Sequence, residues 1–251
     1  GNGAVMRGTL LNTITVLIGS AVGLLVGNRL SARIQESIVT ALGLVTLYVG
    51  VSNTNETGNI IVPLLALLIG TIIGELLRLD LKLEQFAGWL QSRVQGEGAD
   101  HEAGDQRARF IEGFVTSSLV FCVGPLTFVG SIQDGMGIAS GFEQLAIKST
   151  LDLFAAMAFA ASLGIGVMFS VVTVLGVQGG LALMGYFAGE FMTDPMINEM
   201  TAVGGLILIA LALTLMDIKK PRTVNFLPGL IIAPIMVAAA AALGIEIYPA
   251  L

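Results

Sequence analysis

Charged side chains are scarce in this sequence. Only 12% of its 251 residues are Asp, Glu, Lys or Arg, whereas soluble domains carry about 25%. Hydrophobic residues make up 55% of the chain, and the mean hydropathy is +0.87. This composition excludes an ordinary soluble globular protein and predicts an all-α protein that crosses a membrane several times. Because one helical crossing needs about 20 apolar residues, the chain has room for about ten at most.

Cysteine and histidine are almost absent. Cys122 is the only cysteine, which excludes a disulfide within the chain and suits a packing residue. His101 is the only histidine, so we expect no histidine-based metal site. The methionines between 184 and 200 are interpreted as packing residues, because no thiolate or imidazole accompanies them.

Common catalytic signatures are also missing. The chain has no HExxH, no GxSxG and no phosphate-binding P-loop. We therefore expect neither an enzyme nor a bound cofactor. The net charge of −6 says little about partners, and the partners we expect are the lipid bilayer and a small solute or ion, without nucleic acid.

Long apolar segments dominate what the sequence does contain. The segment from Ala146 to Gly189 has 44 residues and is divided at Gly164 into a fifth and a sixth span. With the other segments this predicts eight spans in a single membrane domain, residues 1–251. The remaining spans are expected near Gly8–Gly27, Ser37–Val51, Ile60–Leu77, Phe110–Gly130, Thr201–Met216 and Phe226–Ile245.

Three segments between the spans differ from them. Residues 79–94 place apolar residues at steps of three and four, which is typical of an amphipathic helix. This helix is expected either in the headgroup plane or packed on the protein itself. Residues 96–106 are acidic and glycine-rich, and we expect a mobile loop there. Ser131–Gln144 is expected to be irregular, either as a loop or as a segment that re-enters the membrane.

Basic residues are distributed unevenly around the eight spans. Only Arg7 and Lys148 lie on the N-terminal side. Because Lys and Arg collect in cytoplasmic loops, we expect a bacterial inner-membrane protein with both termini outside. The ten basic residues expected on the cytoplasmic side are Arg29, Arg33, Arg78, Lys82, Arg93, Arg107, Arg109, Lys219, Lys220 and Arg222.

Three short similarities predict an internal repeat. Thr40–Gly43 matches Thr201–Gly204, Val62–Leu65 matches Leu227–Leu230, and Gly23 with Gly27 matches Gly185 with Gly189. Spans 1–3 (8–78) would then correspond to spans 6–8 (167–247), around central spans in 110–165 and a helix and loop in 79–109. Since an odd number of spans separates the copies, they would be inverted, as in many secondary transporters. The alternative is chance similarity among apolar, glycine-rich helices.

The segment from Cys122 to Asp152 carries the most polar groups. Lys148 and Asp152 lie four positions apart, so a helix places them on one face where they can pair. Asp152 is interpreted as a site for a cation or proton with Lys148 as the competing charge. The alternative is a structural ion pair. Gln133 and Asp134 would supply ligands beside a break at Gly124-Pro125, or would form an exposed turn.

Further polar residues lie inside apolar spans. Asn12 and Thr15 fall in the first span and Gln178 in the sixth. Each is interpreted as lining a path or as making an interhelical hydrogen bond, which is the commoner use of such residues. The complete predicted solute or ion site comprises Asn12, Thr15, Gly124, Pro125, Ser131, Gln133, Asp134, Lys148, Ser149, Asp152 and Gln178.

Three segments resemble a known family. They are GTLLNTITVLIGSAVGLLVGNRL at Gly8–Leu30, CVGPLTFVGSIQDG at Cys122–Gly135, and KSTLD with ASLGIGVMFS within Lys148–Ser170. They resemble the bacterial membrane proteins grouped as domain of unknown function 554, the YqgA/YdfK-like family. The resemblance implies an uncharacterised, transport-type integral membrane protein with no established substrate. It also marks Gly130 and Gly135 beside the site residues of Cys122–Asp152.

Together these features predict a secondary, ion-coupled carrier of a small solute or ion. A passive channel and a non-transporting scaffold or sensor are the alternatives. Gly19, Gly23 and Gly27 recur four apart on one face of the first span, where a neighbouring backbone can approach closely. That neighbour is expected to be the sixth span or a second subunit, and a homodimer is the prediction.

Overall fold

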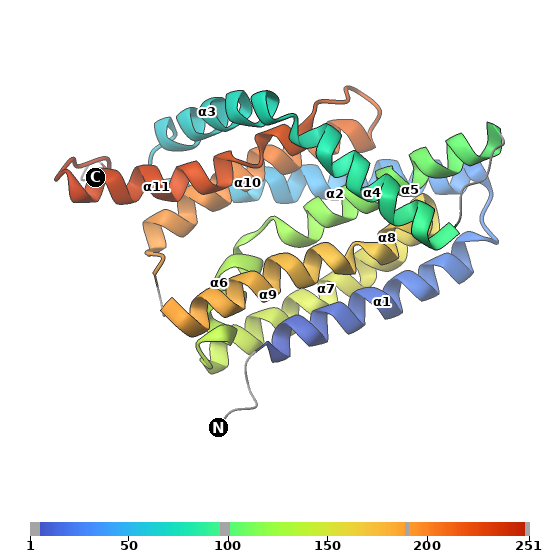
Figure 1. Ribbon diagram of the computed structural model, residues 1–251, viewed down its shortest axis with the longest axis horizontal. Coiled ribbons are helices and arrows are strands. Elements are labelled where there is room, and N and C mark those ends of the chain that lie inside the picture. Colours follow the sequence, from blue (N-terminus) through green and yellow to red (C-terminus); the bar gives the residue numbers. More distant parts are fainter. Residues whose placement is uncertain (1–5, 96–100, 189–190, 249–251) are drawn as a thin grey trace. The chain divides into compact units, whose positions relative to one another are not determined.

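A computed structural model describes residues 6–95, 101–188 and 191–248 (Figure 1). All the regular elements in these ranges are helical, which confirms the all-α part of the predicted fold class. In chain order they are α1 (Arg7–Gly27), α2 (Ala32–Thr54), α3 (Ile61–Leu77), α4 (Leu79–Gln95), α5 (His101–Cys122), α6 (Pro125–Gly135), α7 (Ala139–Leu163), α8 (Gly166–Phe169), α9 (Val171–Ala188), α10 (Asp194–Leu215), the 3-10 helix η1 (Thr223–Phe226) and α11 (Gly229–Ala242).

The lengths and composition of these helices indicate a multi-pass membrane protein. Among the described residues, six helical segments are long and apolar enough to cross a membrane, and there are up to eight if each of two bent pairs forms one span. The pairs are α3 with α4, bent by 56°, and α5 with α6, bent by 67°. Large apolar side chains such as Leu25, Leu76 and Phe187 are exposed, which suits contact with lipid.

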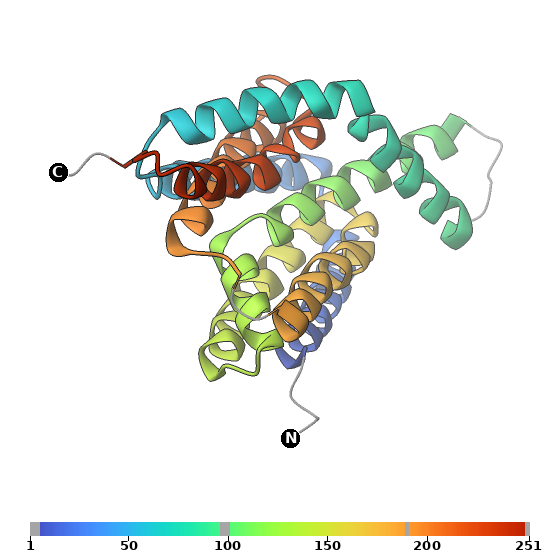
Figure 2. The same cartoon turned by 60° about the vertical axis from the view of Figure 1, so that its left-hand side comes forward.

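Local chain chemistry explains the breaks between helices. Pro125 is the first residue of α6, where its missing N–H costs nothing and its ring disfavours a helical residue before it. Arg78 ends α3 with a left-handed φ of 50°, and Figure 2 shows the chain turning there into α4. Gly164 ends α7 with a φ of 85°, which an L-residue with a side chain rarely adopts.

The structure corrects two predicted segments. Ser131–Gln144 is not irregular, because α6 continues to Gly135 and α7 begins at Ala139. Backbone groups in a membrane must be satisfied internally, so the polar and glycine residues here are accommodated within helices. The predicted loop 96–106 is helical from His101, where α5 begins, and residues 96–100 lie outside the described ranges.

The chain forms two compact units. Unit 1 comprises residues 1–42, 82–122 and 126–190, and unit 2 comprises 43–81, 123–125 and 191–251. In unit 1, α1 lies beside α7 (Figure 1), and Phe121 of α5 packs edge-on against Phe159 of α7. The predicted single membrane domain stays a prediction.

The amphipathic helix α4 packs on the protein itself in unit 1. Ala87 is fully buried against Phe110 and Phe114 of α5, with Leu83 at the edge of the cluster. Trp89 is 53% exposed. This contact agrees with one of the two alternatives for α4, and a position in the headgroup plane stays a prediction.

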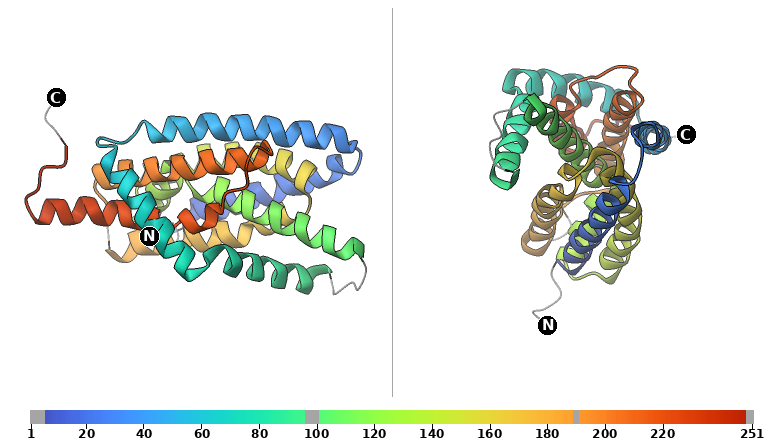
Figure 3. Two further views of the ribbon diagram at one scale, coloured as in Figure 1. Left: turned by 90° about the horizontal axis from the view of Figure 1, so that it is seen from above. Right: turned by 90° about the vertical axis from the view of Figure 1, so that its right-hand side faces the viewer.

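Close backbone contacts hold unit 2 together. Gly50 of α2 meets Gly205 of α10, and α2 runs beside α10 in Figure 3. Gly70 of α3 meets Gly229 of α11. A core of Ala66, Val203, Ile207 and Ala233 fills the space around these contacts. The helices paired here are those that the predicted repeat makes equivalent, but the inverted repeat itself stays a prediction.

Candidate functional site

The middle of α7 carries a buried ion pair. Nζ of Lys148 contacts Oδ2 of Asp152, and these residues are only 6% and 7% exposed. They are one helical turn apart near the centre of a 25-residue helix, on one face as predicted. Because an isolated buried charge is costly, each group is retained by neutralising the other. The pair therefore places two ionisable groups in the interior of unit 1 without adding net charge.

A third side chain reaches the same carboxylate from α1. Nδ2 of Asn12 donates a 2.9 Å hydrogen bond to Oδ2 of Asp152. Asn12 is fully buried, and its amide oxygen has no partner among the described residues. Asn12, Lys148 and Asp152 form the polar cluster of unit 1. One oxygen of Asp152 thus receives both a cation and an amide donor.

The glycines of α1 explain how Asn12 comes so close to α7. A Cβ atom at Gly19, Gly23 or Gly27 would collide with a backbone carbonyl oxygen of α7. The two helices therefore pack backbone to backbone, which small residues permit. The glycine face contacts the chain's own α7 rather than α9, the predicted sixth span. A homodimer stays a prediction.

Asp134, in the last turn of α6, contacts the N-terminus of α1. Its Oδ2 accepts a 3.0 Å hydrogen bond from the Gly8 backbone N–H, and the residue is 3% exposed. A carboxylate here satisfies a free helical N–H and meets the positive end of the helix dipole. The contact gives Asp134 a structural role in holding α6 to α1.

Gln133 connects α6 to α7. Its Oε1 accepts hydrogen bonds from Ser140 Oγ at 3.0 Å and from Gln144 Nε2 at 3.3 Å. Gln133 and the buried Asp134 lie in the last turn of α6, close to the connection that precedes α7. These hydrogen bonds attach the end of α6 to the first turns of α7.

Several fully buried polar atoms in unit 1 have no partner among the described residues. Both amide atoms of Gln178 on α9 are in this state, as are the hydroxyls of Thr9 and Ser131. An unpaired buried polar group costs about 1–3 kcal/mol. Such groups are rare in native proteins. Unit 1 thus has unused hydrogen-bonding capacity on α1, α6 and α9.

The other predicted site residues have local roles in the structure. Thr15 Oγ1 donates to the Asn12 backbone oxygen at 2.9 Å, and Ser149 Oγ donates to the Leu145 oxygen at 2.6 Å. Both hydroxyls therefore donate within their own helices. Gly124 and Pro125 fall in unit 2 and form the break between α5 and α6.

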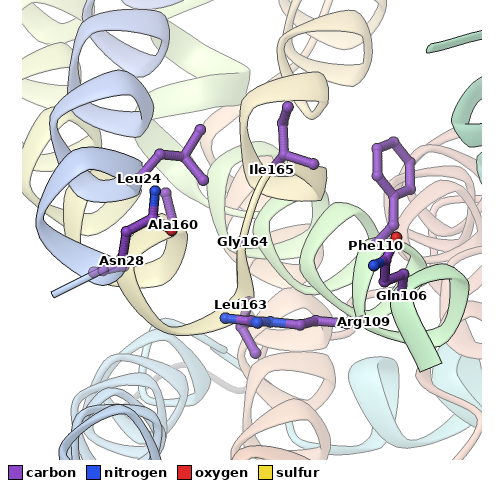
Figure 4. Close-up of a pocket in the computed structure, with 11 residues that line it drawn as sticks. Leu24, Asn28, Gln106, Arg109, Phe110, Ala160, Leu163, Gly164 and Ile165 are labelled. Carbon is purple, nitrogen blue, oxygen red and sulfur yellow. The ribbon is translucent and has the colours of Figure 1, made fainter. Parts of the chain in front are cut away.

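A cavity of about 370 Å³ lies at the C-terminal ends of α1 and α7 in unit 1. In Figure 4 the Arg109 side chain extends from α5 towards Leu163, across from Asn28. Nη2 of Arg109 donates a 2.9 Å hydrogen bond to the Ser162 backbone oxygen. Ala160, which lines the cavity, lies eight residues after Asp152, about 12 Å along the helix. Polar side chains from both α1 and α5 line the cavity, which is separate from the polar cluster.

The sequence did not single out Thr9 or Arg109 as site residues. Thr9 lies three positions before Asn12, so helical spacing places both on one face and could have indicated it. Arg109 was counted only as a loop charge, because its contact with the end of α7 is long-range. The sequence carries no local signal for that contact.

Comparisons with known proteins place these observations in a family. The sequence profile described as "Protein of unknown function (DUF554)" matches residues 7–238, which confirms the predicted resemblance. "Uncharacterized protein YqgA" of Escherichia coli (strain K12) is 33% identical over 229 residues, covering 90% of this chain and 94% of the relative. "Uncharacterized membrane protein YdfK" of Bacillus subtilis (strain 168) is 23% identical over 245 residues, covering 96% and 100%. No solved structure matches the chain significantly.

Proposed function

This chain belongs to the family of proteins of unknown function DUF554, and we propose that it is a secondary transporter of a small polar solute or ion. The observation that carries the proposal is the polar cluster, in which Asn12 and Lys148 meet one carboxylate oxygen of Asp152. Ionisable groups inside a helical membrane protein are rare and mark substrate or ion pathways. The proposal assigns the chain no catalytic step.

Exchange of partners at Asp152 is the central step of the proposed mechanism. A cation, a proton or the positive group of a solute binds Asp152 in competition with Lys148. The displaced ammonium group of Lys148 then binds an anionic group or returns when the cation leaves. Asn12 keeps the carboxylate oriented, and its free amide oxygen accepts a hydrogen bond from the solute.

Neutral polar groups extend the proposed site beyond the charged pair. Gln178 and Ser131 are fully buried and have polar atoms without partners among the described residues. They are therefore available to donate or accept hydrogen bonds from a solute or its water. Asp134 and Gln133 hold the helices that carry the site and do not bind the solute in this proposal.

Alternating access would come from inverted three-helix repeats moving against each other. The antiparallel contacts of Gly50 with Gly205 and of Gly70 with Gly229 support the repeat, because they join helices that the repeat makes equivalent. The cavity at Arg109 would be the cytoplasmic entrance. Both termini would face outward in the bacterial inner membrane, as the basic residues favour. Thiol labelling of single-cysteine variants, with the buried Cys122 replaced, tests this topology.

Proteoliposomes test the transport proposal. The purified protein is reconstituted, and counter-flow is measured for a panel of radiolabelled amino acids, dicarboxylates, polyols and alkali-metal ions. We expect saturable counter-flow of at least one probe in the wild type and its loss in Asp152→Asn. Glu246→Gln, which changes an exposed carboxylate in unit 2, is the matched control and should retain the flux.

Other outcomes separate the alternatives. Flux without counter-flow identifies a passive channel, since a pore does not couple opposite movements. Fluxes that are the same in empty liposomes, in the wild type and in Asp152→Asn indicate a scaffold or sensor and contradict transport.

A further inference from the structure

Unit 2 contains a buried carboxylate that the proposed transport site does not use. Glu199, in the second turn of α10, is fully buried. Within the described residues, the ion pairs are Lys148–Asp152, Lys220–Asp217 and Arg222–Glu75, so no basic side chain neutralises Glu199. A buried carboxylate needs hydrogen-bond donors and a positive charge to offset its lost hydration. The structure supplies the donors from one loop, but not the positive charge.

The loop between α2 and α3 holds the carboxylate at both oxygens. Thr57 Oγ1 donates to Glu199 Oε2 at 2.6 Å, and the Gly58 backbone N–H donates to Oε1 at 3.0 Å. Asn59 fixes the next segment, because its Nδ2 donates to the Ile247 backbone oxygen at 2.6 Å. Loop 57–59 therefore contacts Glu199 through Thr57 and Gly58, and it contacts the C-terminal segment at Ile247 through Asn59. These contacts fix the position of Glu199 without neutralising it.

A cavity of about 160 Å³ lies against this carboxylate. Glu199, Glu56 and Tyr248 are among its lining residues, and none of the described residues that line it is basic. The Tyr248 hydroxyl is buried and lies close enough to Glu199 for the carboxylate to affect its ionisation. A side chain at position 58 would collide with the Tyr248 ring, so glycine there allows the ring to cover the cavity. The lining therefore presents oxygen atoms and negative charge to whatever occupies the space.

From this geometry we propose that Glu199 binds a monovalent alkali-metal cation, Na⁺ or K⁺, in the cavity between loop 56–58, α10 and Tyr248. The cation provides the positive charge that no basic side chain of the described residues supplies to Glu199. Oxygen atoms are the ligands that hard cations prefer. Protonation would also neutralise the Glu199 carboxylate, but it would not require a cavity beside it. A divalent or transition-metal site is disfavoured, because the described residues contain no group of three His, Cys, Asp or Glu side chains. The site does not depend on the transport proposal for unit 1.

Equilibrium binding to the purified protein in detergent tests the site directly. The probes are ²²Na⁺ and, for potassium, ⁸⁶Rb⁺, with choline chloride holding ionic strength constant. We expect saturable binding of one probe in the wild type and at least about tenfold weaker binding in Glu199→Gln. Glu246→Gln is the matched control, because it removes an exposed carboxylate two residues before Tyr248. Preference for one probe identifies the ion.

A second variant tests the site if Glu199→Gln does not fold. Tyr248→Phe removes only the hydroxyl and leaves the hydrogen bonds from Thr57 and Gly58 to Glu199 intact, so severalfold weaker binding is expected. The proposal is overturned if the wild type binds neither probe, or if a folded Glu199→Gln binds as the wild type does. Unchanged affinity in Tyr248→Phe, when Glu199→Gln does not fold, also overturns it. None of these results depends on solute flux.

Discussion

The side-chain amide of Asn12 donates a 2.9 Å hydrogen bond to Asp152, which lies 140 positions further along the chain. The contact joins α1 to the middle of α7, and it exists because the glycine face of α1 lets the two backbones touch. The interhelical contact and the buried charge are therefore coupled. Changes at the glycines should disturb the polar cluster, and changes in the cluster should weaken helix packing.

Removing one member of the ion pair should be more harmful than removing both. Lys148→Met leaves the Asp152 carboxylate buried without its cation, which costs about 3–5 kcal/mol for a buried pair. In Lys148→Met/Asp152→Asn both charges are gone, and Asn12 can still donate to the amide at position 152. The double variant should therefore be more stable than Lys148→Met. SDS-induced unfolding of the four proteins measures this double-mutant cycle.

The expected result is a strong, favourable coupling between the two positions. If the effects of the single changes simply add up in the double variant, Lys148 and Asp152 do not interact in the folded protein. That result would contradict the buried ion pair independently of any flux measurement.

Gly23→Ala tests the contact between α1 and α7. The added Cβ would collide with the Met157 backbone oxygen, and the resulting overpacking should cost about 1–3 kcal/mol. Gly180→Ala on α9 is the matched control, because its Cβ would meet no atom and alanine favours a helix by about 1 kcal/mol. Unfolding in SDS measures both. Equal stability of the two variants would contradict close packing at Gly23.

Local chemistry in the sequence was sufficient to predict the all-helical class, a multi-pass membrane protein and the one-turn pairing of Lys148 with Asp152. Each depends on composition or on spacing within one helix. The partners of Asn12, Asp134 and Glu199 could not be predicted, because each lies more than 100 positions away. The prediction for 131–144 was wrong because glycine and polar residues were given more weight than the need of a membrane-embedded backbone for helical hydrogen bonds.

Asp134→Asn should separate a capping role from a binding role. The amide still accepts from Gly8 but loses the charge that faces the positive end of α1, so a cost of about 0.3–2 kcal/mol is expected. Asp134→Ala also removes the acceptor and should be less stable than the Asn variant. Transport of any probe identified for the wild type should persist in Asp134→Asn. Loss of flux in a fully folded Asp134→Asn protein would instead make Asp134 a ligand.

Tyr248 should titrate at unusually high pH. Burial, followed by the negative charge of Glu199, raises the pKa of Tyr248 from 10.0 to about 12. The unfolded chain loses this proton first, so the contribution of Tyr248 to stability is constant below about pH 10 and decreases as the pH rises towards about 12. Phenolate absorbance of the wild type minus that of Tyr248→Phe, recorded in choline chloride so that no alkali-metal cation neutralises Glu199, isolates this one hydroxyl.

Glu199→Gln is the informative partner in that titration. Removing the neighbouring charge should lower the pKa of Tyr248 towards 10.0, while burial still holds it above that value. The same difference titration is recorded in the Glu199→Gln background. A difference signal that appears near pH 10 in the wild type would place Tyr248 in water, away from Glu199. That result would contradict the position of Tyr248 over the cavity beside Glu199.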